Sequence, residues 1–206
     1  FHSEQPSGGV ANENTYTMHN PFLALHREGK LPARMRLDFL HQDSPTANPP
    51  LPTLSQRLRN SFPFFGDEWV KTGGIGEFTG GGVEGLRAIA KAGWRGEDHA
   101  LNLAGVTNLI KDRETVHAET PLTNLRWIIS HIPDFPVELA NRANAMGIGV
   151  LVGWGPLRNG MNVGPPYKTL MGHAIKKGYH SDGGDITVIN PWLNFYTIMT
   201  GKNLAG

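Results

Sequence analysis

The sequence has no cysteine and no long apolar run. Without thiols it forms neither disulfides nor thiolate metal sites, so any bound metal must be held by histidine and carboxylate side chains. This leaves the compartment open, with the cytoplasm favoured. No segment approaches the roughly 20 apolar residues that a membrane-spanning helix needs, so we expect no membrane association. The chain starts with Phe1-His2-Ser3-Glu4, without an initiator Met or a signal peptide, and we expect it to be part of a longer polypeptide.

The chain also lacks a strong net charge of either sign. The 206 residues contain 19 Lys and Arg against 18 Asp and Glu, spread along the chain. No basic stripe of the kind that binds nucleic acid is present, which favours a small-molecule substrate. The length suits one domain with a sizeable core. These features are compatible with a homo-oligomer.

Apolar periodicity alternates between strand and helix patterns after a polar, loop-rich segment over residues 1–33. Each Pro in 45–52 favours an extended loop. Helices are expected over 83–93, 136–146 and 190–199, and strands over 35–40, 69–78, 127–131, 148–152 and 179–182. Strands separated by about the length of a βα unit predict a parallel α/β architecture over residues 34–206.

Four polar side chains follow strand ends: Glu77, His99, His131 and Asp182. Parallel α/β proteins place their active sites at the carboxyl ends of the strands. Imidazole nitrogens and a carboxylate suit zinc or another divalent ion, and a carboxylate beside activated water can accept its proton. The position of these residues therefore predicts a metal-dependent site.

Each of these residues also has a plainer interpretation. The chain has nine histidines, most of which we expect on the surface or in structural hydrogen bonds. Ser181-Asp182-Gly183-Gly184 suits a turn, and Glu77 suits an exposed strand end. The glycines near Glu77 fit no phosphate-binding loop, and no G-x-S-x-G elbow occurs. His180, Trp154 and Tyr167 are positioned to line a substrate pocket or to pack.

The sequence resembles amidohydrolase family 3, the group of metal-dependent hydrolases that includes bacterial YtcJ. The resemblance covers roughly residues 20–206. It is carried by the order and spacing of short motifs: Gly29-Lys30-Leu31-Pro32-Ala33-Arg34, Gly73-Gly74-Ile75-Gly76-Glu77-Phe78, His99-Ala100, Ile129-Ser130-His131, Gly178-Tyr179-His180-Ser181-Asp182 and Asn190-Pro191-Trp192.

The resemblance implies a (β/α)8 TIM barrel, of which this chain holds about strands 3 to 8, with the accompanying β-sandwich missing. It implies that His99 and His131 are metal ligands after the fifth and sixth strands, and that Asp182 is the metal-bound catalytic carboxylate after the eighth. The His-x-His pair of the first strand is absent. Gly76 and Glu77 stand where relatives often carry a lysine, so Glu77 replaces that bridging ligand or the site holds one metal instead of two.

The resulting expectation is hydrolysis of an amide or other non-peptide C–N bond of a small molecule by metal-activated water. Asp182 would shuttle the proton and His131 or His180 would polarise the substrate, with zinc as the expected ion and manganese or iron as alternatives. One alternative is a non-catalytic barrel that has lost a complete metal site. Another, ranked last, is a glycosidase that uses Glu77 and Asp182 as a carboxylate pair.

Overall fold

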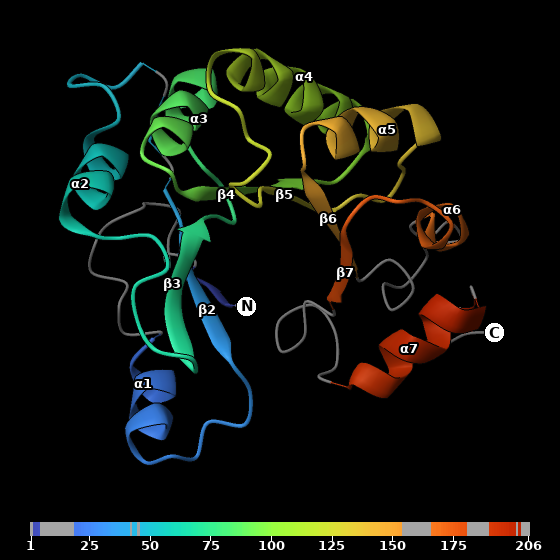
Figure 1. Cartoon of the computed structure of the whole chain (residues 1–206), viewed down its shortest axis with the longest axis horizontal. Coiled ribbons are helices and arrows are strands. Elements are labelled where there is room, and N and C mark those ends of the chain that lie inside the picture. Colours follow the sequence, from blue (N-terminus) through green and yellow to red (C-terminus); the bar gives the residue numbers. More distant parts are fainter. Residues whose placement is uncertain are drawn as a thin grey trace. The chain divides into compact units, whose positions relative to one another are not determined.

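The computed structural model describes most of the chain, namely residues 2–4, 19–41, 43, 44, 46–153, 166–180, 190–200 and 202 (Figure 1). The chain divides into two compact units. Unit 1 comprises residues 1–98 and 118–121, and unit 2 comprises residues 99–117 and 122–206. Each unit has its own set of parallel strands.

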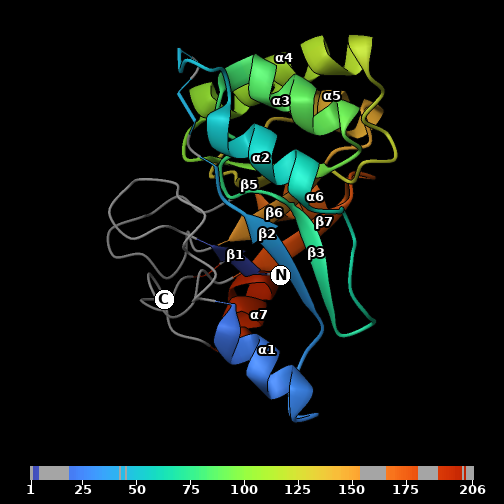
Figure 2. The same cartoon turned by 90° about the vertical axis from the view of Figure 1, so that its left-hand side faces the viewer.

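Unit 1 is a parallel α/β structure. Its strands are β1 (His2–Glu4), β2 (Met35–Phe39), β3 (Val70–Ile75) and the first four residues of β4 (Arg95–Ala100), and each pairs in parallel with the next along the chain. Its helices are α1 (Asn20–Arg27), α2 (Pro52–Asn60) and α3 (Gly82–Lys91), of which α2 and α3 contact each other (Figure 2). The segment 1–33, expected to be rich in loops, thus contains β1 and α1.

The pairing of β2 with β3 is irregular at the buried carboxylate Asp38. Leu37 pairs with Thr72 and Phe39 with Ile75, so Gly73 and Gly74 both stand opposite the single residue Asp38. Two residues opposite one is the arrangement of a β-bulge. A Cβ atom on Gly73 would lie 2.0 Å from Asp38 Oδ1, so only glycine fits there.

Asp38 is fully buried and forms an ion pair with Arg95 of β4, with Nη2 2.5 Å from Oδ2. Burial raises the pKa of Asp38 to about 6, against the opposing effect of the Arg95 charge. A buried ion pair contributes little net stability when intact, but the loss of one partner leaves an uncompensated buried charge. The pair therefore fixes β2 and β4 relative to each other across β3.

A distant carboxylate caps α2. Asp43, in the loop after β2, accepts hydrogen bonds from the backbone N–H groups of Thr53 at 3.2 Å and Leu54 at 2.8 Å. These N–H groups belong to the first turn of the helix, where they have no partner within the helix itself. The helix begins at Pro52, where a missing N–H is tolerated. The last proline of the stretch 45–52 is therefore the first residue of α2.

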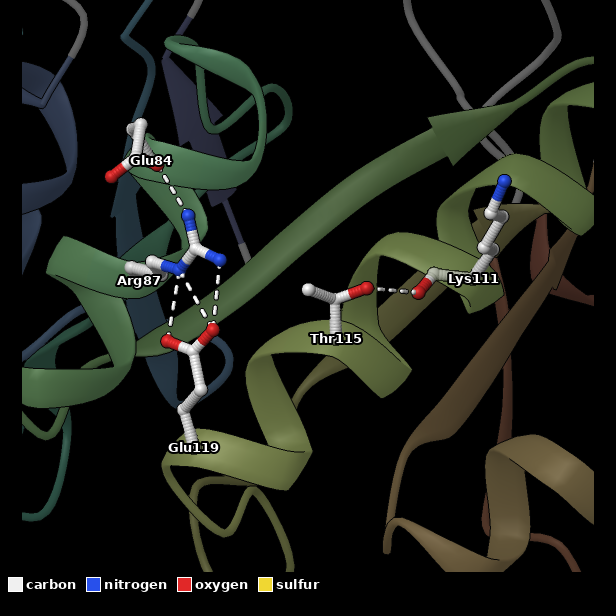
Figure 3. A network of polar contacts seen from close by, with 5 residues as sticks. All are labelled: Glu84, Arg87, Lys111, Thr115 and Glu119. Carbon is white, nitrogen blue, oxygen red and sulfur yellow. Dashed lines mark hydrogen bonds and ion pairs between the residues drawn. The ribbon is translucent and has the colours of Figure 1, made fainter.

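Arg87 of α3 joins this helix to the end of α4 (Leu103–Glu119). Its guanidinium donates from Nε and Nη2 to the carboxylate of Glu119 at 2.8 to 3.1 Å, and from Nη1 to Glu84 one turn earlier (Figure 3). Because all these side chains are at least partly exposed, we expect the network to contribute little to stability.

Unit 2 is also a parallel α/β structure. Most of α4 lies here, together with β5 (Ile128–His131), α5 (Val137–Ala145), β6 (Gly149–Gly153), α6 (Tyr167–Met171), β7 (Lys177–His180) and α7 (Pro191–Thr200). β5 pairs in parallel with β6, and β6 with β7. Arg142 of α5 donates two hydrogen bonds of 2.8 Å to Glu114 of α4.

The predicted parallel α/β class is confirmed, as are five strands and three helices. Gly93 and Gly147 follow α3 and α5 with left-handed φ values, and Asn190 caps α7 through a 3.0 Å bond from the Trp192 N–H. The strand end predicted near His99 belongs to β4, whose start was not predicted. Helices α1, α2, α4 and α6 were not predicted, and β1 adds a strand to the six expected. No helix in the described part of the chain has the length and hydropathy needed to cross a membrane.

Replacing Arg95 with Leu should leave the Asp38 carboxylate buried without its cation. In the full-length protein we expect a loss of about 3 to 5 kcal/mol in unfolding free energy at pH 8, measured by urea denaturation. The folded-state pKa of Asp38 lies above that of the unfolded chain, so protonation favours the folded state. The Arg95 charge lowers the pKa of Asp38, so in Arg95→Leu this pKa should lie above 6 and the carboxyl group should be protonated at a higher pH than in the wild type. The loss should therefore shrink as the pH falls from 8 toward 6. The control Arg36→Leu should change stability by less than about 0.5 kcal/mol, and an equal effect of the two variants would contradict the assignment.

Candidate metal centre

Three histidine side chains of unit 2 gather at the carboxyl ends of strands. His99 lies near the end of β4, His131 ends β5 and His180 ends β7. The rings of His99 and His131 have centroids 4.0 Å apart at 84°, and those of His131 and His180 are 4.6 Å apart at 68°. His131 therefore lies between two imidazoles, each meeting it edge to face.

The backbone at His131 turns sharply. The N–H of Ile132 donates to the carbonyl of Ser130 at 3.0 Å, and His131 between them has a φ of 69°. A hydrogen bond spanning two residues with a positive central φ defines a γ-turn, of the rare and strained kind. Ile132 follows with a φ of 35°, which a β-branched residue seldom adopts. Strain of this sort is concentrated at functional sites.

The γ-turn also brings the two rings together. The strand register pairs His131 with Val152 and Val152 with Tyr179, so a regular strand would point His131 to the same side as Tyr179. His180, the next residue after Tyr179, points to the opposite side. The left-handed φ at His131 breaks this alternation, and its ring lies beside that of His180.

A glycine makes room for His180. A Cβ atom on Gly153 of β6 would lie 2.5 Å from both Cδ2 and Nε2 of the His180 ring. Real Cβ atoms do not approach other atoms this closely, so any larger residue would displace the ring or the strand. The position of His180 thus depends on a glycine in the neighbouring strand.

Burial keeps His131 neutral. Its side chain is 4% exposed, and desolvation, followed by the proximity of His99 and then His180, lowers its pKa to about 2. A neutral imidazole is the form that coordinates a metal. One ring nitrogen of His131 lies within 4.8 Å of one of His99, a separation that a single ion could bridge after small side-chain rotations. The pair therefore fits a divalent metal.

The other residues predicted for the site are Glu77, Tyr167, Asp182 and Trp154. Glu77 follows β3 in unit 1 and is half-buried. Tyr167 lies on α6, buried, with its ring 6.1 Å from that of Tyr179, on the side of β7 away from His180; burial raises its pKa to about 12. Asp182 and Trp154 lie outside the described residues. The roles assigned to all four stay predictions.

Sequence reasoning missed the charged residues of β4. Arg95, Glu97 and His99 alternate with Gly96, Asp98 and Ala100, so the first three share one face of the strand. Glu97 is 2% exposed. The period of two was visible in the sequence, but the alternating residues are charged instead of apolar.

Three solved structures resemble the chain. An uncharacterized metal-dependent hydrolase from Pyrococcus furiosus matches 96% of it with a TM-score of 0.63 at 13% identity, and another from Pyrococcus horikoshii OT3 matches 89% with 0.56 at 14%. A guanine deaminase from C. acetobutylicum, solved with bound guanine in the active site, matches 82% with a TM-score of 0.55 at 12% identity.

The chain spans 46%, 42% and 44% of these three structures, which is less than half of each. No protein-family model and no curated protein sequence matches it. At these identities the likeness establishes the fold alone: the chain shares the α/β fold of part of each of these structures.

Replacing Gly153 with Ala should move the His180 ring away from His131. In the full-length protein with ¹³C-labelled histidine, we expect the nuclear Overhauser effect between the two rings to disappear. Gly172→Ala is the matched control, because the nearest atoms to its added Cβ lie 3.8 Å away. An unchanged ring contact in Gly153→Ala would show that the strand spacing does not fix His180.

The metal-free protein should lose stability in acid because of His131. Its folded-state pKa lies below its unfolded value of about 6.5, so its contribution is complete above pH 6.5 and falls as the pH is lowered toward 2. We expect a loss of about 2 kcal/mol between pH 6.5 and 5 by urea denaturation, at roughly 1.36 kcal/mol per pH unit. His131→Gln should lack this part of the pH dependence. Parallel curves for the two proteins would refute the lowered pKa.

Proposed function

We propose that this chain is part of a metal-dependent hydrolase of the amidohydrolase superfamily, related to family 3, which cleaves an amide or other non-peptide C–N bond of a small molecule. The observation that carries the proposal is the pair of clustered histidines at strand ends, of which His131 is kept neutral by burial and is held in a strained γ-turn. The fold likeness to two metal-dependent hydrolases and to a guanine deaminase supports the same reaction class.

In this proposal His99 and His131 hold the ion, with carboxylates from Glu77 and Asp182. A divalent metal, with zinc expected first, supplies the Lewis acidity that activates water for attack on the carbonyl carbon. Because two histidines and two carboxylates form only part of the superfamily's ligand set, we propose that residues outside this chain complete the centre. One ion or two would be consistent with this donor set.

The other residues act on the substrate and on protons. Asp182 takes the proton from the attacking water and gives it to the departing nitrogen, as a general base and then a general acid. His180 lies beside His131, where its imidazole can donate a hydrogen bond to the substrate carbonyl oxygen. Trp154, directly after β6, would contribute aromatic surface to the pocket. Tyr167 would act on the substrate only indirectly, because it packs against Tyr179 on the side of β7 away from His180.

The closed eight-stranded barrel and its β-sandwich belong to the same proposal. The described strands run parallel in chain order within each unit, which is the arrangement of consecutive βα units in such a barrel. A non-catalytic barrel is the competing function. It would account for the missing His-x-His pair, and it predicts an intact fold that binds no metal.

Asp182→Asn in the full-length protein should abolish hydrolysis of small amides, by a factor of at least about 10³, because the amide cannot accept the proton. Metal content, measured by elemental analysis, should stay close to that of the wild type. Asp185→Asn, three residues further along the same glycine-rich segment, is the matched control and should retain activity. Full activity in Asp182→Asn would refute its role, and a folded wild type without metal would favour the binding protein.

A further inference from the structure

Helix α7, drawn in red in Figure 1, exposes its largest apolar side chains. Four of them, spaced three and four residues apart on one helical face, are between 45% and 76% exposed: Trp192, Phe195, Tyr196 and Met199. The buried residue of this helix is Thr197, a small polar one. A surface helix ordinarily turns its apolar stripe toward the core. In α7 the side chains with the largest apolar area point outward.

The helix is well defined at both ends but short. At its start the Oδ1 atom of Asn190 accepts a 3.0 Å hydrogen bond from the N–H of Trp192, and at its end the hydroxyl of Thr200 donates to the carbonyl of Tyr196 at 2.7 Å. A helix of ten residues is marginal in water unless an apolar face packs against another surface. No other element in the described part of the chain packs extensively against α7. The exposed face therefore lacks the surface that would stabilise it.

The exposed face has the composition of a protein–protein interface. Aromatic residues and Met are enriched at the centres of interfaces, where charged residues are depleted. Residues 191–200 contain no Asp, Glu, Lys or Arg. A helix that lies on a membrane surface carries instead a strongly polar face rich in Lys and Arg. The composition of α7 thus favours a protein partner over a lipid surface.

The neutrality and the area of this face suit a second copy of the same chain. In a two-fold symmetric dimer the same patch lies on both subunits, so charges near the axis would meet their own copies, and α7 has none to repel. At about 200 Å² for each large side chain, the exposed fractions correspond to roughly 500 Å² per subunit. A pair of helices would bury about 1,000 Å² in total, which is enough for a specific interface.

We propose that the protein forms a homodimer in which the exposed face of α7 packs against α7 of a second copy. The four side chains follow the spacing of a helix-pairing seam. The rings of Trp192 and Phe195 already lie 5.9 Å apart, so part of the face is packed before any partner arrives. Trp and Tyr are also the residue types that contribute most to binding energy at interfaces. The inference goes beyond the proposed hydrolase activity and does not depend on it.

The dimer can be tested by sedimentation equilibrium of the full-length protein over a dilution series. We expect the wild type to dimerise. Phe195→Glu, in the middle of the face, should raise the dissociation constant at least about thirtyfold, as the loss of an interface hot spot does, because two like charges would meet near the axis. Val137→Glu is the matched control: it places the same charge on an apolar residue of α5 that is about half exposed, and it should dimerise like the wild type.

Urea unfolding of the same proteins separates a dimer from other ways of covering α7. The midpoint of the wild type should rise with protein concentration, because association stabilises the folded state, and that of Phe195→Glu should not. A monomeric wild type, or a Phe195→Glu variant that still dimerises, would overturn the inference. An equal loss of stability in Phe195→Glu at every concentration would overturn it in favour of cover by another part of the same polypeptide. A dimer of this kind that hydrolyses no amide would refute the proposed function and leave the inference intact.

Discussion

The γ-turn at His131 is the constraint on which the candidate metal centre depends. β5 is a regular strand up to Ser130, and a regular continuation would carry the His131 side chain to the wrong side of the sheet. One residue with a φ of 69° corrects this and brings three imidazoles together. The strain is tolerable because the flanking residues are anchored. Ile129 and Ile132 are fully buried, so the backbone on either side of the turn is held by packing.

Much of the fold could be predicted because apolar periodicity is strong where helices and strands cover the core. The helix over 82–91 buries Leu86, Ile89 and Ala90 on one face, and the strand over 149–153 is almost continuously apolar. Only the end of strand β4, near His99, was predicted, because Arg-Gly-Glu-Asp-His contains no apolar alternation that would mark the rest of the strand. Helix α4 was missed for a related reason: its charged and apolar residues are distributed without a pronounced face. The predicted apolar face of α7 exists, but its residues Trp192 and Met199 are about three-quarters exposed.

The candidate site also has features that could be predicted from the sequence and features that could not. The positions of His99 and His131 followed from the placement of strand ends, and the structure brings their rings together. The γ-turn could not be predicted, because nothing in Ser130-His131-Ile132 marks two successive positive φ values, and a β-branched residue such as Ile132 seldom adopts one. The dependence of His180 on Gly153 is equally hidden, since it arises between strands separated by more than 20 residues. Long-range contacts of this kind leave no local signal in a single sequence.

The glycines opposite β4 are required by the spacing of the strands and not by the charges of β4. A Cβ atom on Gly74 would lie 2.7 Å from the carbonyl oxygen of Arg95, and one on Gly76 would lie 2.8 Å from Glu97 Cβ, an atom that every residue except glycine has. Replacing Arg95 or Glu97 would therefore leave no room for a side chain at position 74 or 76. The identity of the residues on β4 can change independently of these glycines, whereas a substitution at either glycine would have to move the backbone of one of the two strands.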